Sequence, residues 1–307
     1  MNTAAKYIAV ILTILLTMSA CSEESDRHNL DHLTPSFTTA ITRVTDNMWD
    51  RGDQVGISMM QGSQILRDKN NFCYNARPDG SLSPCRSAIT YPEDNTPVDI
   101  IAYYPYTDSS RNGLYTIDLA NQGRLSSIDV LYSSNARDKQ TRDKQIQLAF
   151  SHKLTLVTLN LDNNSEENVS IRLYTETKGE INLATGQIKN NGGYKLVTNF
   201  DGQRAIVMPG SRSKVEVVCG STKKSLDIPT DMLETGKKFN LNVIINKNAT
   251  DTTITFGNAT INDWGQGRDY DFEIEVGKEG GDTPVVVPGD FYVSPMMIDA
   301  QPTGIQL

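Results

Sequence analysis

The chain contains 307 residues with a formal net charge of −8, and it has four cysteines and only three histidines. An acidic balance without a basic cluster argues against nucleic acid or an anionic membrane surface as the partner. The residues after an N-terminal leader suffice for one large or two ordinary domains, and they include no apolar run long enough to cross a bilayer. The sequence also lacks a phosphate-binding glycine loop, a dinucleotide fingerprint and an H-E-x-x-H zinc motif.

The N-terminal segment has the pattern of an export signal. Lys6 precedes the almost wholly apolar residues 7–18, a length that suits a signal peptide better than a membrane span. Small residues lead up to Cys21 in a pattern that resembles a bacterial lipobox, and the acidic residues 22–26 resemble the export signal of Bacteroidetes surface lipoproteins. We therefore expect residues 1–20 to be removed, Cys21 to be lipidated, and residues 21–34 to form a polar tether on the outer membrane, exposed at the cell surface. An ordinary secretory signal with a chance cysteine is the alternative.

The body of the chain alternates apolar and polar residues, which is typical of strands with one buried face. Turn sequences such as PDG, NNGG and ETG separate these stretches, and no long helical pattern appears. The sequence therefore predicts an all-β fold built of β-sandwiches. The clearest alternating positions are Phe37, Thr39 and Ile41; Val55, Ile57 and Met59; Val98, Ile100, Ala102 and Tyr104; Val169, Ile171 and Leu173; Val215, Val217 and Cys219; and Phe239, Leu241, Val243 and Ile245.

The run SHKLTLVTLNL at 151–161 changes its apolar face midway. Leu154 and Leu156 lie on one side of the expected strand, and Leu159 and Leu161 lie on the other. This pattern predicts either a β-bulge or a strand that is covered on both faces.

A polar break at residues 162–168 is the expected boundary between two domains. We predict one sandwich over residues 35–163 and a second over residues 164–277. A glycine-rich and acidic linker then leads into a C-terminal tail, together spanning residues 278–307.

Three cysteines remain besides Cys21. An exported chain passes through an oxidising compartment, where disulfides can form. If PDG at 78–80 forms a three-residue hairpin loop with its glycine in the left-handed conformation, Cys73 falls opposite Cys85, and a disulfide across the hairpin is expected. Cys219 lies in an apolar strand-like run and is expected to be a buried thiol.

Few residues suit catalysis or metal binding. His28 and His32 lie four apart within the expected tether, where a solvated segment is a simpler interpretation than a metal site. His152 begins a strand-like run without a G-x-S-x-G motif, so we expect a hydrogen-bonded residue at a strand end rather than a catalytic base. The scattered carboxylates favour a solvated surface over a glycosidase pair. The sequence therefore predicts no enzyme, no metal and no cofactor.

The tripeptide Arg51-Gly52-Asp53 matches the motif that integrins recognise in exposed loops. Three-residue matches arise often by chance. Here the tripeptide leads directly into the strand that begins near Val55, so we expect it to form a turn.

Four landmarks occur in a characteristic order: WDRGDQVGISM at 49–59, VDIIAYYPY at 98–106, LAFSHKLTLVTLNL at 148–161 and TITFGNATINDW at 253–264. This ordered set resembles the fimbrillin family of Bacteroidales, the Mfa-like subunits of type V fimbriae, over about residues 36–265. The resemblance implies two transthyretin-like β-sandwich domains in tandem. It also implies a structural subunit of a surface fimbria, or pilus, that supports adhesion.

The resemblance further implies an assembly mechanism. An arginine-directed surface protease cuts such lipoproteins after their first strand, and a neighbour's C-terminal strand fills the groove that opens. On this chain, residues 35–42 are the expected removable strand, Arg43 is the expected cleavage site and Val44 is the new N-terminus. Arg51 and Arg27 are weaker alternatives for the cut.

The C-terminal tail is the expected donor strand. Val285 and Val287 alternate, and Phe291 and Val293 do so again. Prolines interrupt a long β-ladder, so the donor can be confined to residues 289–294 or lie among residues 296–298. A disordered or self-docked tail is the alternative.

The expected partners are other fimbrial subunits, identical or related, the arginine-directed protease, and the outer membrane through the lipid. Two alternative functions remain at this stage. One is a fimbrial anchor that keeps its lipid and its first strand. The other is a non-polymerising surface lipoprotein that binds a glycan or a host ligand.

Overall fold

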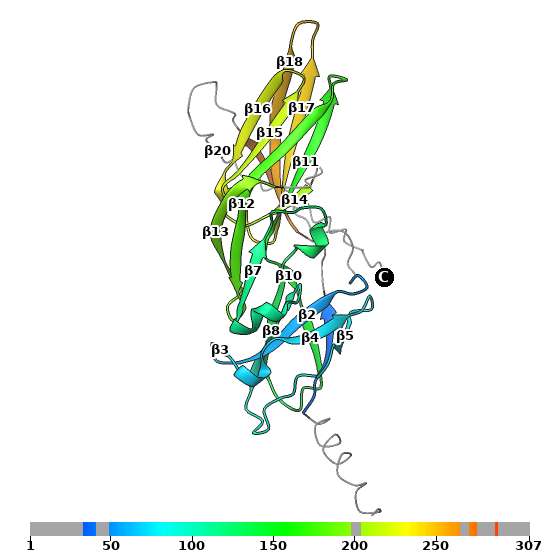
Figure 1. Ribbon diagram of the computed structural model, residues 1–307, viewed down its shortest axis with the longest axis vertical. Coiled ribbons are helices and arrows are strands. Elements are labelled where there is room, and N and C mark those ends of the chain that lie inside the picture. Colours follow the sequence, from blue (N-terminus) through cyan, green and yellow to red (C-terminus); the bar gives the residue numbers. More distant parts are fainter. Residues whose placement is uncertain (1–32, 41–48, 198–203, 265–269, 275–285, 288–307) are drawn as a thin grey trace, which may run out of the picture.

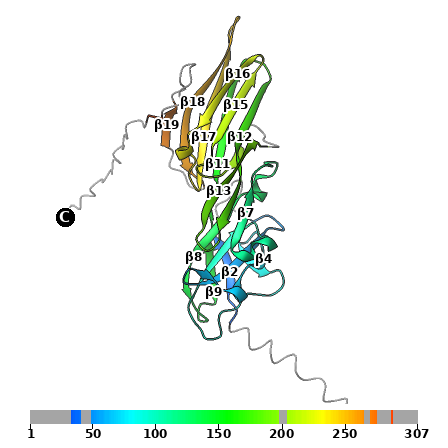
Figure 2. The same cartoon turned by 60° about the vertical axis from the view of Figure 1, so that its left-hand side comes forward.

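The computed structural model describes residues 33–40, 49–197, 204–264, 270–274 and 286–287 (Figure 1). This part of the chain consists of β-strands and four short 3-10 turns, so the prediction of an all-β fold is confirmed. The molecule is elongated, with one sheet at one end and two longer sheets at the other (Figures 1 and 2). None of the described segments forms a helix of the length and hydropathy needed to span a membrane. The 3-10 turns are η1 (Arg67–Lys69), η2 (Asp108–Asn112), η3 (Leu125–Ser127) and η4 (Thr230–Met232).

The first sheet contains nine strands and curls around its own core. The last strand of its path, β9, is tied back to β8 through the Asn135 side chain, which donates to Gln147 O and accepts the Ala149 N–H, both at 2.9 Å. The order is β10 (Ser151–His152), β8 (Leu131–Lys139), β6 (Val98–Tyr104), β2 (Gln54–Gln61), β4 (Phe72–Ala76), β5 (Ser81–Pro84), β1 (Ser36–Ala40) and β9 (Gln145–Ala149), with β3 (Gln64–Ile65) beside β2.

Two further sheets face each other at the other end of the molecule. Within the six-stranded sheet, β11 runs parallel to β17, and the other neighbours are antiparallel. Its order is β14 (Arg204–Val207), β11 (Thr155–Asn164), β17 (Lys237–Lys247), β18 (Thr252–Asp263), β19 (Tyr270–Ile274) and β20 (Val286–Val287). The five-stranded sheet contains β13 (Gln187–Leu196), β12 (Val169–Asn182), β15 (Ser213–Cys219) and β16 (Thr222–Ile228), and β7 (Leu114–Asp118) pairs with β12.

Three clusters of buried apolar residues form the cores. The first lies inside the nine-stranded sheet and includes Phe37, Val55, Ile57, Tyr74, Ile146 and Leu148. The second lies between the two long sheets and includes Val157, Leu159, Val217, Cys219 and Phe239. The third draws on all three sheets and includes Met60, Tyr103, Leu154, Leu156, Ile181 and Trp264. This third cluster joins the two ends of the molecule by apolar contact.

The face change at 151–161 is explained by this arrangement. Leu154 and Leu156 belong to the third core, whereas Val157 and Leu159 belong to the second. The registers of β11 with β14 and β17 are continuous over the paired residues. The strand is therefore covered on both faces, and the bulge is not observed. Leu161 differs from the expectation, because it lies beyond this covered part and is 42% exposed.

The expected boundary at residues 163–164 stays a proposal about folding units. β11 ends at this boundary and would belong to the first domain. It nevertheless pairs with β14 and β17, which both follow the boundary in the sequence. β7 comes from the first half of the chain and pairs with the end of β12, from Leu114 opposite Asn182 to Asp118 opposite Lys178. Sheet membership is thus not divided where the polar break lies.

Candidate functional site

β1 is an interior strand of the first sheet, although it lies at the start of the described chain. It pairs antiparallel with β5 and parallel with β9, and it appears in dark blue beside β5 in Figure 1. The Ser36 N–H donates to Lys144 O at 2.8 Å, and Ala40 O accepts the Phe150 N–H at 3.0 Å. The described strand coincides with most of the segment 35–42 that the sequence predicted to be removable.

Phe37 is the main apolar contact of β1 with the first core. It is 2% exposed and meets the Tyr74 ring edge-on, with the ring centroids 5.4 Å apart. Its neighbours across the ladder are Leu82 on β5 and Ile146 on β9. Because strand neighbours at the same level share a face, these three side chains form one row above Tyr74.

Thr39, two residues later, makes a polar contact on the same face. Its Oγ1 accepts the indole N–H of Trp49 at 2.7 Å and donates to Gly80 O at 3.1 Å, and its backbone N–H donates to the same carbonyl at 2.8 Å. Trp49 is buried at 2% exposure and packs edge-on against Tyr104 and Phe150. The position of Thr39 therefore combines an apolar surrounding with one hydrogen-bond donor.

The residues that precede β1 continue its alternation. Leu33 and Pro35 are buried, while Ser36 and Thr38 are exposed. The carbonyl of Leu33 accepts the Tyr91 N–H at 2.9 Å. Positions 33, 35, 37 and 39 thus face the protein, and the positions between them face solvent.

The β4–β5 hairpin forms one wall beside β1 and carries the predicted disulfide. Cys73 and Cys85 are bonded, with a Cα–Cα distance of 5.4 Å, and the Cys85 N–H donates to Cys73 O at 2.9 Å. Gly80 has φ of 82°, and Arg77 and Ser81 close a three-residue loop, as predicted. Hydrogen bonds from the Ser81 hydroxyl and N–H lower the pKa of Asp79 within this loop. The disulfide and the register of this hairpin are both confirmed.

Most of the other predicted site residues lie outside the described residues. These are the lipidation site Cys21, the cleavage site Arg43, and Val285, Phe291 and Val293 of the donor strand. The structure describes the backbone of Val287, which lies in β20 opposite Glu273 of β19. Their roles remain proposals.

The integrin-like tripeptide forms a structural turn. The Asp53 carboxylate is buried, accepting the Tyr104 hydroxyl at 2.9 Å and the Asp50 N–H at 2.7 Å. Gly52 has φ of 97°, and Arg51 is exposed. Since the carboxylate is already bound within the protein, the tripeptide does not present the acid that an integrin would recognise.

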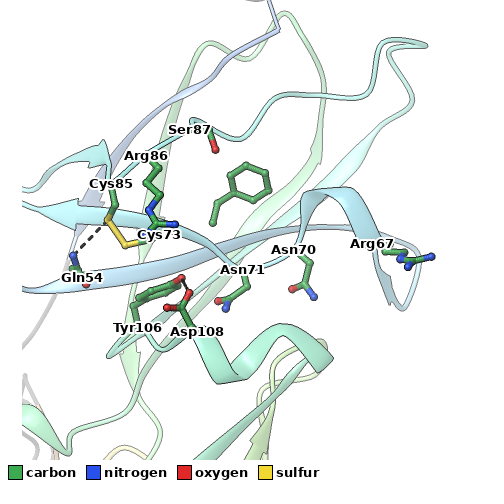
Figure 3. Close-up of a pocket in the computed structure, with 11 residues that line it drawn as sticks. Gln54, Arg67, Asn70, Asn71, Cys73, Cys85, Arg86, Ser87, Tyr106 and Asp108 are labelled. Atoms are coloured by element: carbon green, nitrogen blue, oxygen red, sulfur yellow. Dashed lines mark hydrogen bonds between the residues drawn. A yellow bond between two sulfur atoms is a disulfide. The ribbon is translucent and has the colours of Figure 1, made fainter.

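A shallow cleft of about 830 Å³ lies beside the disulfide and was not predicted from the sequence (Figure 3). Arg86 and Ser87 line it from one side, and Tyr106 and Asp108 line it from the other. The Tyr106 hydroxyl donates to the Asp108 carboxylate at 2.6 Å. The cleft shares no lining residue with the contacts of Phe37 and Thr39, so it is a separate feature of the first sheet.

His152 and Cys219 have structural surroundings. His152 is buried at the end of β10, where Nδ1 lies 3.0 Å from Asp129 and the ring stacks on Trp264 at 4.0 Å. The Cys219 thiol is buried and lies 3.2 Å from the Ser165 hydroxyl. Both agree with the predictions. Among the described residues, no cluster of acidic, histidine or cysteine side chains has a metal-binding arrangement.

Comparison with known proteins identifies the family. The fimbrillin-like family matches residues 42–264. One relative, a Bacteroides uniformis protein assigned as fimbrium subunit Fim1C, is 26% identical over 234 residues, which are 69% of this chain and 77% of the relative.

Two crystal structures of proteins assigned to cell adhesion share the fold. That from Bacteroides uniformis has a TM-score of 0.60 and 22% identity, covering 76% of this chain and 98% of the other. That from Bacteroides ovatus has a TM-score of 0.55 and 18% identity, covering 75% and 97% respectively. Since the family match spans most of its length, this chain belongs to the fimbrillin-like family.

Proposed function

We propose that this chain is a structural subunit of a surface fimbria, and that it assembles when β1 leaves and a strand from a neighbouring subunit takes its place. The observation that supports this most is the interior position of β1 between β5 and β9. Residues 41–48 join β1 to Trp49 and include Arg43. A cut after Arg43 would leave β1 held to the sheet by noncovalent contacts alone.

Departure of β1 would create a groove that favours a new strand. The facing edges of β5 and β9 would present unpaired backbone N–H and C=O groups. The pocket that Phe37 fills would be exposed, and burying a side chain of that size again stabilises by roughly 1.5–3 kcal/mol. A strand added to this groove would form backbone hydrogen bonds with both edges, and its alternate side chains would fill the exposed pockets.

The expected lipid on Cys21 fits this proposal as an export anchor. Lipidation would hold the precursor at the outer membrane until a surface protease acts. In a stalk subunit, cleavage at Arg43 would release both the lipid and β1. In an anchor subunit, both would be kept. The partners are then further fimbrial subunits, identical or related, in keeping with the name of the Bacteroides uniformis relative.

The N-terminal residue of the protein on its native cell surface tests this proposal. Mass spectrometry should find Val44 as the first residue of the mature, assembled form. A lipidated Cys21 as the only N-terminus in surface material would contradict a stalk role and leave an anchor that keeps β1.

A second test uses the purified precursor and an arginine-specific protease. Cleavage should yield a ladder of high-mass species that collapses on heating, because the subunits are joined by hydrogen bonds and apolar contacts only. Arg43→Ala should prevent both the cut and the ladder. Arg51→Ala is the matched control, since Arg51 is an exposed arginine beyond β1. A ladder that persists in Arg43→Ala but disappears in Arg51→Ala would refute the proposed cleavage site.

A further inference from the structure

Bonds between distant segments hold the walls of the cleft beside the disulfide (Figure 3). The bond between Cys73 and Cys85 joins the segment that carries Arg86 to β4. On the opposite side, the Tyr106 N–H donates to Gln54 O at 2.9 Å and joins the segment after β6 to β2. The walls are therefore in place before a ligand arrives, which lowers the entropic cost of binding.

Asn71 links the start of β4 to the segment after β6. Its Nδ2 donates to Thr107 O at 2.9 Å, and its Oδ1 accepts the Tyr103 hydroxyl at 2.7 Å. Asn71 is buried and has φ of 60°, in the left-handed region that asparagine adopts more readily than most residues. Because its side-chain oxygen and nitrogen are both bonded within the protein, Asn71 fixes the shape of the cleft.

The lining of the cleft carries more positive than negative charge. It includes the guanidinium groups of Arg67 and Arg86 and the carboxylate of Asp108. Within the described part of the chain, neither arginine forms an ion pair. A ligand with one negative charge would balance this lining, and a carboxylate matches the planar fork of a guanidinium.

The remaining lining suits a small polar ring. Phe72 and Tyr106 are half-buried, and Phe72 packs against the first core while also lining the cleft. The Ser87 hydroxyl and the Asp108 carboxylate are exposed there and can bond to hydroxyl groups. The cleft volume of about 830 Å³ is that of a small-ligand site, and such sites combine aromatic side chains with a few polar groups.

We propose that this cleft binds a sugar carboxylate, either a hexuronic acid or a sialic acid unit of a larger glycan. Arg86 binds the carboxylate, and Asp108 and Ser87 bind ring hydroxyls. Phe72 and Tyr106 lie against the C–H faces of the sugar. Arg86 is the main contact because its neighbour Cys85 is fixed by the disulfide, whereas Arg67 lies at the far end of the cleft (Figure 3) and also lines a second pocket.

This site goes beyond the proposed function and does not depend on strand exchange. The cleft lies apart from the contacts of Phe37 and Thr39, so it is unaffected when β1 is replaced. Each copy in a fimbria would then carry one site. Weak binding at single sites becomes strong attachment when many sites engage one glycan surface.

Saturation-transfer NMR on the purified full chain tests the inference with two matched pairs of sugars. Methyl β-glucuronide is compared with methyl β-glucoside, which has a hydroxymethyl group in place of the carboxylate. A methyl sialoside is compared with its methyl ester. At least one acidic sugar should bind about tenfold tighter than its neutral counterpart, the effect of a charge-assisted hydrogen bond. Equal binding within both pairs, or no binding of any sugar, would overturn the inference.

Variants of Arg86 locate the binding. Arg86→Gln should weaken binding of the acidic sugar about tenfold, and Arg86→Lys, which keeps the charge without the fork, should weaken it less. Arg77→Gln is the matched control, because Arg77 is an exposed arginine of the same hairpin outside the lining, and it should change binding less than about twofold. Equal losses in Arg86→Gln and Arg77→Gln would show that binding follows net charge, and would overturn the assigned site.

Two further measurements separate this site from other roles of the cleft. A short glutamate peptide should displace the acidic sugar only weakly, and stronger binding of the peptide than of either sugar would overturn the assignment to a saccharide. Arg86→Gln should leave the protease-dependent ladder of high-mass species unchanged. Loss of that ladder in Arg86→Gln would show that the arginine serves assembly instead, and would overturn the inference.

Discussion

Phe37→Ala should weaken the attachment of β1 to the first sheet more than any other single truncation within that strand. Phe37 is 2% exposed, and it fills the space between Leu82, Ile146 and the Tyr74 ring. Phenylalanine-to-alanine changes at such sites cost about 3–5 kcal/mol, through lost burial and the cavity that remains. For a chain of this size, about 3 kcal/mol corresponds to a fall of roughly 6–12 °C in the melting temperature of the affected unit.

Urea unfolding of the uncleaved precursor measures this effect. Trp49 lies in the first core and contacts β1 through Thr39, so its fluorescence reports on this region. Thr38→Ala is the matched control, because Thr38 lies on the exposed face of the same strand and should change the free energy of unfolding by less than about 0.5 kcal/mol. Equal unfolding midpoints for Phe37→Ala and wild type would refute the view that Phe37 anchors β1. A loss as large in Thr38→Ala would refute the assigned faces.

Two further predictions concern the disulfide and an ion-pair cluster on the five-stranded sheet. Replacing Cys73 and Cys85 together by serine should lower the free energy of unfolding by about 2–3 kcal/mol, because the bridge restricts the unfolded chain across 12 residues of sequence separation. Reductant should destabilise the wild type similarly and leave the double variant unchanged, and an unaltered wild-type midpoint after verified reduction would contradict this. Lys223, at 2.6 Å, and then Arg172, at 3.1 Å, hold the pKa of Glu216 below its usual range. This depressed pKa stabilises the folded state above the ordinary glutamate pKa, and the stabilisation is lost as the pH falls through the lower folded value. Carboxyl NMR titration should show a larger rise in the pKa of Glu216 in Lys223→Ala than in Arg172→Ala, and the reverse order would refute the assigned causes.

Much of the local structure could be predicted from the sequence. Alternation located β2, β6, β15 and β17, because successive side chains of a strand point to opposite faces whatever its partners are. The hairpin with the disulfide was predictable for a similar reason. A glycine that can adopt positive φ sets the loop, the loop sets the register, and the register places Cys73 opposite Cys85.

Contacts between distant segments were not predictable in this way. β1 lies against β9 across about a hundred residues, with Ser36 bonded to Lys144. β7 leaves the first half of the chain to pair with β12. The run at 151–161 showed that a face change exists, but not whether a bulge or a second core causes it. Such pairings depend on which edges and faces meet after the chain collapses, and no local pattern records that.

The sequence by itself determined an all-β chain, the phase of its strands, the disulfide hairpin and the family. These follow from residue periodicity, turn geometry and an ordered set of landmarks. Only the tertiary structure decided that β1 is an interior strand, that Phe37 fills a pocket above Tyr74, and that Thr39 accepts the Trp49 N–H. The physical reason is that the alternation of side chains between the two faces of a strand is a local property of its sequence. The neighbours of that strand are set by contacts between distant parts of the chain.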